Sequence, residues 1–295
     1  MVKNILVTGA NGQLGNSLRK IQATYPNYAF YFTDIDTLDI CDKKRLSEFV
    51  HTNQIRYILN CAAYTAVDQA EDDRENCMRI NRDAIRFIGE IAHAEGIKII
   101  HISTDYVFDG TQTHPYREED QTNPLSVYGQ SKLEGEIALQ NVCPDAVIIR
   151  TAWLYSEYGA NFVKTMLRLG KERTEIKVVC DQTGSPTYSE ELAVAMMSII
   201  EHRPFIPGIY HFTSEGVCSW YDFAVKIMEL ARLDCQVYPI KTCEYPTRAI
   251  RPAYSVLDKE KIRKTFNLQI PPWEESLEKC LDEFLLIANM QSEPL

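Results

Sequence analysis

The chain has 295 residues, of which 45% are hydrophobic, and it carries a formal net charge of −10 at pH 7. This composition predicts a globular protein with room for one large or two modest hydrophobic cores. The acidic balance argues against nucleic-acid binding, and no apolar run is long enough to predict a membrane span. We therefore expect a cytoplasmic protein with no nucleic-acid or membrane partner, whose anionic ligands would need locally placed Arg or Lys side chains.

The cysteine and histidine patterns point away from disulfides and zinc. The nine cysteines are odd in number, scattered, and include no Cys-x-x-Cys pair, so we interpret them as reduced and mostly packed thiols. The six histidines show no His-Glu-x-x-His motif, which argues against a catalytic zinc site. A strand-like run starts almost at the first residue, so no signal peptide is expected.

A strand, a glycine turn and a helix are predicted at the N-terminus. Residues 4–8 form a short apolar run, and three glycines follow it at Gly-x-x-Gly-x-x-Gly spacing, before leucine and isoleucine recur at helical spacing. Such a turn lets the backbone approach a pyrophosphate, which the free N–H groups of the helix N-terminus bind. The cofactor-binding residues expected in this turn are Gly9, Gly12, Gln13, Leu14 and Gly15.

A second strand is predicted over residues 28–33, and it ends in Asp34. An acidic residue about 20 positions after the glycines can bind the hydroxyls of the adenosine ribose. No Arg follows Asp34 directly, which favours NADH, but the basic residues at 43–45 leave NADPH open. Asp39 and Ile40 could contact the adenine, although residues 39–42 could equally be a polar turn that caps the next helix.

Strand-like and helix-like segments alternate through the first half of the chain. Further strands are predicted at 57–60, 98–103 and 146–150, and helices at 43–52, 72–95 and 128–140. This alternation predicts an α/β fold with a doubly wound (Rossmann) parallel sheet, which binds ligands beyond the carboxyl ends of its strands. We place the NAD(P)-binding domain at residues 1–154, to which later segments can return, and a smaller C-terminal substrate-binding lobe mainly at 155–295.

Tyr128 and Lys132 stand four residues apart, downstream of Thr104. On a helix, that spacing puts the phenol and the ammonium on one face. A phenol pKa near ~10 is too high for proton transfer at neutral pH, and a neighbouring cation would lower it. With Thr104 holding a carbonyl oxygen, this group could protonate that oxygen while its carbon accepts a hydride. A solvated tyrosine beside a surface lysine is the alternative, which the glycine turn upstream disfavours.

Five runs carry more extended motifs, at residues 7–15, 60–71, 103–110, 123–136 and 150–155. Together with shorter matches at 161–162, 181–187 and 251–252, they resemble the extended short-chain dehydrogenase/reductase superfamily. Within it, they are most similar to the dTDP-4-dehydrorhamnose reductase family, and the resemblance covers nearly the whole chain. It implies reduction of dTDP-4-dehydro-β-L-rhamnose to dTDP-β-L-rhamnose with NADPH or NADH.

The resemblance also implies roles for individual residues. Tyr128 would donate the proton, while Lys132 would lower its pKa and bind the nicotinamide ribose. Thr104 and Asp105 would contact the sugar, and Trp153 would pack against it, unless Trp153 is simply a core residue after a strand. The remaining implied site residues are Ala63, Tyr64 and Thr65 for the cofactor and Arg251 for the substrate.

One departure from this family concerns a metal. Some members form a magnesium-dependent dimer through a glutamate two residues after the third glycine, and here that residue is Ser17. The substitution argues against a metal-bridged dimer, whereas Glu190 and Glu191 could still supply carboxylates to Mg²⁺. A homodimer without the metal bridge stays open.

Three other functions fit the same motifs. In nucleotide-sugar 4,6-dehydratases a glutamate follows the Thr-Asp pair, and Tyr106 at this position cannot replace a carboxylic acid near neutral pH. A nucleotide-sugar epimerase on the same fold is harder to exclude. The third alternative is a non-catalytic partner that resembles the regulatory β subunit of methionine adenosyltransferase, because such a protein could keep Tyr128 and Lys132.

Overall fold

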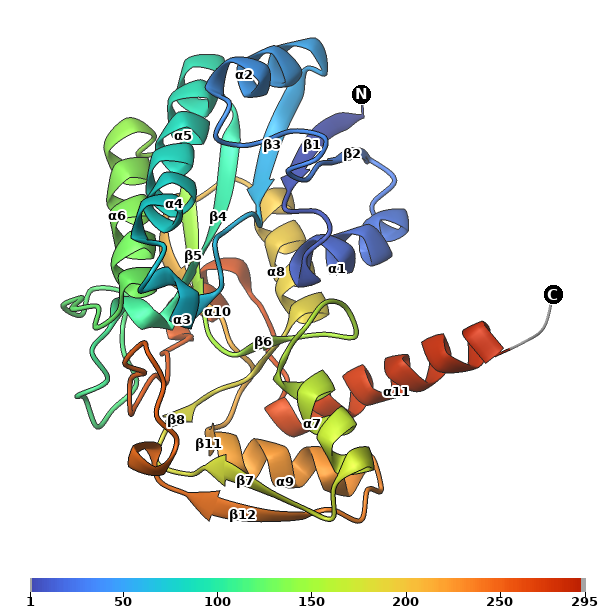
Figure 1. Cartoon of the computed structure of the whole chain (residues 1–295). Helices are drawn as coiled ribbons and strands as arrows, with labels where there is room; N and C mark the ends of the chain where they lie inside the picture. The colour runs from blue at the N-terminus through green and yellow to red at the C-terminus, as the bar shows by residue number, and fades with distance from the viewer. Residues whose placement is uncertain (1, 293–295) are drawn as a thin grey trace.

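The computed structural model describes residues 2–292 of the chain, and the side chains of all of these except 285 and 287–292. Six parallel strands form a central sheet in the order β10-β5-β4-β3-β1-β2 (Figure 1). These strands are β1 (Lys3–Thr8), β2 (Tyr28–Phe32), β3 (Ile55–Asn60), β4 (Lys98–Thr104), β5 (Val147–Thr151) and β10 (Gly208–His211). All five strands predicted from the sequence are present, and the doubly wound α/β class is confirmed.

The strands bury side chains on both faces of the sheet. On β1, Ile5 and Val7 belong to the core beneath α1 (Gln13–Ile21) and α8 (Ser189–Glu201), whereas Leu6 belongs to the opposite core. That second core is covered by α2 (Lys43–Thr52), α5 (Ala84–Glu95) and α6 (Val127–Val142) (Figure 1). Burial on both faces explains why the strands read as continuous apolar runs.

The helix predicted over residues 72–95 is present, but it is not a regular α-helix. It runs through α4 (Arg74–Met78), a π-helical turn (Arg79–Asp83) and α5, which ends at Gly96 with a left-handed φ of 66°. Such turns occur most often next to functional sites. Here the turn directs Asn81 at the segment that follows β3.

The sixth strand comes from far along the chain. Ile209 of β10 pairs with Ile148 of β5, and α8, which precedes β10, packs beside α1. The sheet is thus completed by residues from beyond 154.

The rest of the second half forms a smaller lobe below the sheet in Figure 1, around its own core of apolar side chains. Its paired strands are β6 (Leu154–Tyr155) with β9 (Thr187–Tyr188), β7 (Glu175–Val179) with β12 (Gln236–Ile240), and β8 (Thr183–Gly184) with β11 (Cys218–Ser219). Its helices are α7 (Phe162–Glu172), α9 (Trp220–Leu230) and α11 (Trp273–Ser292). The short helices α3 (Val67–Ala70) and α10 (Glu260–Phe266), and 3₁₀ turns at Gln22–Thr24, Asp105–Val107 and Thr242–Glu244, lie in the connections.

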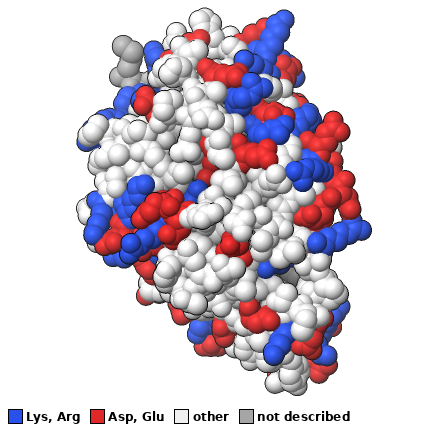
Figure 2. Space-filling view, turned by 90° about the vertical axis from the view of Figure 1, so that its left-hand side faces the viewer, with Lys and Arg blue, Asp and Glu red and all other residues white. Residues whose placement is uncertain are grey.

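Basic and acidic side chains are interspersed on the face shown in Figure 2. Several of them form ion pairs between neighbouring helices, such as Lys43–Glu90 and Arg82–Glu134. Within residues 2–292, no helix is both long and apolar enough to cross a membrane.

Candidate active site

A cavity of about 850 Å³ follows the carboxyl ends of β1, β3, β4 and β5 and reaches the smaller lobe. This is where a doubly wound sheet is expected to bind its ligands. Of the residues predicted for the site, the cavity is lined by Gly9, Gly12, Gln13, Leu14, Asp34, Asp39, Ile40, Ala63, Thr65, Thr104, Asp105, Tyr128, Lys132 and Trp153. The predicted residues that do not line it are Gly15, Tyr64, Arg251 and Glu190.

The glycine turn between β1 and α1 forms one end of the cavity. Gly9 has a φ of 63°, and a side chain there would come within 2.6 Å of the backbone nitrogen of Ala62. Gly15 serves packing rather than ligand contact, because a side chain there would come within 2.5 Å of Ala10. Gly12 precedes the first residue of α1, whose free N–H groups therefore face the cavity.

Asp34 follows β2 and lies against the glycine turn. Its Oδ2 accepts a hydrogen bond from the backbone nitrogen of Asn11 at 2.8 Å, and its Oδ1 accepts one from Ile35 at 2.8 Å. Asp39 and Ile40 line the same part of the cavity. Of the nearby basic residues, Lys43 is paired with Glu90, whereas Arg45 donates to the carbonyl oxygen of Thr37 at 3.2 Å. An adenosine ribose bound at this end would thus lie beside the Asp34 carboxylate rather than beside a basic side chain.

The segment after β3 is fixed by Asn81, which the sequence did not single out. Its side-chain amide accepts from the backbone nitrogen of Tyr64 at 2.8 Å and donates to the Tyr64 carbonyl oxygen at 3.0 Å. Ala63 and Thr65 therefore face the cavity, while the Tyr64 hydroxyl turns to Asp73 at 3.2 Å.

Tyr128 and Lys132 lie one turn apart on α6, as predicted, and both line the middle of the cavity. The helix begins there because Ser126 caps it, accepting from the backbone nitrogen of Gly129 at 3.1 Å. Thr104, the last residue of β4, donates to Asp105 Oδ1 at 3.0 Å and accepts from the backbone nitrogen of Tyr106 at 3.2 Å. The Tyr106 ring meets that of Tyr128 edge to face, with centroids 5.6 Å apart.

Burial is the main cause of the pKa shifts of Tyr128, Lys132 and Asp105. It raises the pKa of the Tyr128 phenol above its ordinary value, and the Thr104 side chain opposes the rise only in part. Burial likewise lowers the pKa of Lys132 to about 8, although Glu136 opposes this, and raises that of Asp105 to about 6. That Lys132 lowers the phenol pKa stays a prediction, and the Lys132 ammonium donates to the Ile102 carbonyl oxygen at 2.6 Å.

Residues 153–161, which we call the substrate segment, begin at the far end of the cavity with Trp153 and then contact Gln13 at the glycine turn. Within this segment, residues 153, 154 and 159–161 line the cavity. Trp153 has a φ of 49° and stacks on Trp220, with ring centroids 3.6 Å apart and planes 12° from parallel. Both tryptophans line the cavity. Trp220 begins α9, and a capping box marks that helix start in the sequence, but no local pattern reveals that its ring meets Trp153.

Arg251 lies outside the cavity. It binds Asp68 with its Nη2 2.7 Å from Oδ2, next to the lining residue Val67. Burial lowers the pKa of Arg251, but its bond with Asp68 and the neighbouring Tyr106 raise it overall.

The carboxylates considered for a metal are engaged by lysines. Glu190 lies 2.7 Å from the ammonium of Lys20 through Oε2 and 2.7 Å from that of Lys279 through Oε1. Ser17 brings no carboxylate and pairs with the hydroxyl of Ser189. Among the residues that the structure describes, no group of three or more His, Cys, Asp or Glu side chains is arranged to hold a metal ion. The donor set therefore does not fit Mg²⁺.

Comparison with known proteins gives one consistent match. Residues 3–286 match the family model described as RmlD substrate binding domain. A dTDP-4-dehydrorhamnose reductase of Aggregatibacter actinomycetemcomitans is 42% identical, over 92% of this chain and 96% of that protein. The spore coat polysaccharide biosynthesis protein SpsK of Bacillus subtilis is 39% identical, over 95% of this chain and 97% of that protein.

Solved structures agree. A dTDP-4-dehydrorhamnose reductase from Bacillus anthracis in complex with NADP has a TM-score of 0.92 and 41% identity, over 96% of this chain and 100% of that one. By sequence, structure and the arrangement of its cavity, the chain belongs to the RmlD substrate binding domain family.

Proposed function

We propose that this protein reduces the 4-keto group of dTDP-4-dehydro-β-L-rhamnose to give dTDP-β-L-rhamnose, with a hydride from NADPH or NADH. The observation that carries the proposal is the convergence of Tyr128, Thr104 and Lys132 midway along the cavity. The glycine turn at one end suits a dinucleotide, and the tryptophan pair at the other suits a sugar ring. A nicotinamide and a keto-sugar would then meet beside the phenol.

Tyr128 is the proton donor in this proposal. The raised pKa of its phenol keeps the proton in place until the keto oxygen gains charge from the incoming hydride. Thr104, which lines the cavity together with Tyr128, would hold that oxygen in line. Once the proton has moved, the nearby Lys132 ammonium would stabilise the phenolate and bind the nicotinamide ribose.

The remaining residues divide between the two ligands. Gly9, Gly12, Gln13 and Leu14 would bind the pyrophosphate, and Asp34 the adenosine ribose, while Ala63 and Thr65 line the nicotinamide end. Asp105 and Trp153 would contact the sugar. The Bacillus anthracis relative holds NADP, which supports NADPH here, while Asp34 suits the free ribose of NADH. We therefore expect both cofactors to be used.

A turnover assay tests the proposal against its rivals. Purified protein is mixed with dTDP-4-dehydro-β-L-rhamnose and either reduced cofactor, and nicotinamide absorbance and sugar product are followed together. A reductase consumes one cofactor for each product molecule, whereas an epimerase forms product and consumes none. Cofactor binding without any product would instead indicate a non-catalytic partner protein.

A further inference from the structure

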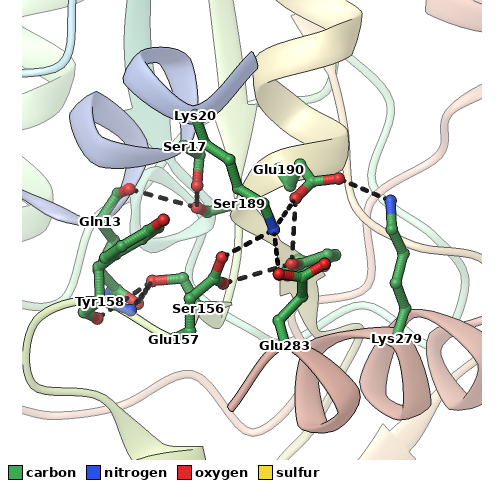
Figure 3. A network of polar contacts seen from close by, with 11 residues as sticks. Gln13, Ser17, Lys20, Ser156, Glu157, Tyr158, Ser189, Glu190, Lys279 and Glu283 are labelled. Carbon is green, nitrogen blue, oxygen red and sulfur yellow. Dashed lines mark hydrogen bonds and ion pairs between the residues drawn. The ribbon is translucent and has the colours of Figure 1, made fainter. Parts of the chain in front are cut away.

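Lys20 on α1 lies between three carboxylates from three other segments (Figure 3). Its ammonium is 3.2 Å from Glu157 of the substrate segment, 2.7 Å from Glu190 of α8 and 2.7 Å from Glu283 of α11. Lys279 adds a second ammonium, but it contacts Glu190 alone, at 2.7 Å. Lys20 thus joins α1 to the substrate segment, α8 and α11.

Of the three contacts that Lys20 makes, the one with Glu157 matters most, because the Glu157 side chain is buried. The Glu157 side chain is fully buried, with an exposed fraction of 0%, and Lys20 is the only cation that it meets among the described residues. Its other partner is the Tyr188 hydroxyl at 3.3 Å. A buried carboxylate that loses its cation is strongly destabilised, so the ammonium of Lys20 holds Glu157 in place.

The same helix binds the substrate segment at a second point. Gln13, seven residues before Lys20 and therefore on nearly the same face of α1, donates to the Leu154 carbonyl oxygen at 3.3 Å. The Gln13 side-chain oxygen accepts from Ser156 (Figure 3) and from Asn161, each at 3.0 Å. The substrate segment therefore rests on the helix whose N-terminus faces the dinucleotide end of the cavity.

We propose that Lys20 is a positioning residue whose ammonium fixes the substrate segment on α1, between carboxylates of three other segments. Residues 153, 154 and 159–161 line the cavity, and Leu154 and Asn161 contact Gln13 next to the glycine turn. The contact of Lys20 therefore sets how this segment lies against both the dinucleotide end and the tryptophan pair. The readout on the sugar rests on the proposed function.

The experiment compares Lys20→Met with Lys279→Met. Both variants remove an ammonium that contacts Glu190, but only Lys20 reaches Glu157. We expect Lys20→Met to raise both the KM for the keto-sugar and the Kd for NADPH, each roughly five- to tenfold. The substrate segment carries Trp153 at one end and contacts Gln13, next to the glycine turn, at the other. Lys279→Met should leave both values within about twofold. Equal effects of the two variants would overturn the proposal.

A double variant distinguishes a role of Lys20 in positioning the substrate segment from a role in stabilising the fold. Lys20→Met/Glu157→Gln removes the one fully buried carboxylate of the cluster together with its lysine, and the partly exposed Glu283 keeps contact with water. Its Tm should therefore return toward that of wild type while KM for the sugar stays raised. A KM that recovers together with Tm would show that Lys20 only stabilises the fold. Lys20→Arg, which keeps the charge, should retain a KM closer to wild type than Lys20→Met does.

Amide hydrogen exchange gives a readout that needs no turnover. Residues 154–161 should exchange faster in Lys20→Met than in wild type or Lys279→Met. If wild type does not reduce the sugar, the proposed function fails, but faster exchange of this segment still supports the role of Lys20. Unchanged exchange refutes that role whether or not the protein is active.

Discussion

The ammonium of Lys132 donates to the main-chain carbonyl oxygen of Ile102 at 2.6 Å, and the side chain is almost completely buried. A lysine held in this way keeps one fixed position relative to Tyr128, one turn away on α6. Its charge is costly to bury, which explains why its pKa falls to about 8. A fixed position and a charge that is costly to bury are properties expected of a lysine that takes part in a reaction.

Tyr128→Phe should lower kcat by about 10²–10⁴-fold, because it removes the hydroxyl and keeps the ring. The Kd for NADPH should stay within about twofold, since no bond of Tyr128 to the glycine turn is lost. Steady-state kinetics and fluorescence titration measure the two quantities. A variant within about threefold of wild-type kcat would contradict the assignment of Tyr128 as proton donor.

Lys132→Met should weaken cofactor binding and yet raise the stability of the protein at pH 7. Below a pH of about 8 the folded protein has to bury a charge, which the unfolded chain keeps in water. A shift from 10.5 to about 8 corresponds to roughly 3–4 kcal/mol of unfolding free energy, less the contribution of the lost bond to Ile102. Urea unfolding measures it. A variant that is both less stable and equally active would mean that Lys132 is a structural residue.

Asp34→Ala should shift the NADPH/NADH ratio of kcat/KM toward NADPH by about tenfold or more. Two negative charges about 4 Å apart in a half-solvated site repel by a few kcal/mol at most. Asp36→Ala is the matched control, because Asp36 is exposed and does not line the cavity. An unchanged ratio in Asp34→Ala would show that this carboxylate does not face the 2′ position.

Asp105→Asn should remove a pH-dependent loss of stability. Burial raises the Asp105 pKa from 3.8 to about 6, so between these values the folded protein binds more protons than the unfolded chain. Stability therefore falls as pH rises through this window, by about 2–3 kcal/mol in total. Unfolding free energies measured from pH 4 to pH 7 should converge with those of Asp105→Asn at low pH. Parallel curves would contradict the ionisation assigned to Asp105.

Chelation of divalent metals should change neither turnover nor Tm. Glu190 already binds two ammonium groups, and the described residues offer no metal-binding group of carboxylates. Protein dialysed against EDTA should match untreated protein within about twofold in kcat/KM, and added Mg²⁺ should have no effect. Activity that is lost with EDTA and restored by Mg²⁺ would contradict this prediction.

The sequence was most informative where structure is local. Strands buried on both faces leave apolar runs, and the Gly-x-x-Gly-x-x-Gly turn has few other uses, so the sheet and the dinucleotide end could be predicted. Helical spacing predicted that Tyr128 and Lys132 share one face of a helix, and the glycine turn upstream favoured their interpretation as a reacting pair. The spacing of the glycines did not reveal that Gly15 packs on Ala10, because that contact depends on how closely the helix approaches the strand.

Contacts between distant segments could not be predicted. Asn81 reaches Tyr64 only because a π-helical turn interrupts a helix that looks regular in the sequence. The direction of the Lys132 ammonium depends on how α6 packs on β4, and Trp220 stacks on Trp153 although 66 residues separate them in the sequence. No single-sequence pattern encodes such pairs, since each partner looks ordinary in its own segment.

The late position of β10 has a consequence for how the chain is made. Until Gly208–His211 leave the ribosome, β5 is an edge strand with unpaired backbone groups beside the emerging active site. A nascent chain that ends near residue 154 would therefore expose a strand prone to pairing with other chains. We expect the cofactor-binding half to become protease-resistant during synthesis only after about residue 211 has emerged, much later than a self-contained N-terminal domain would.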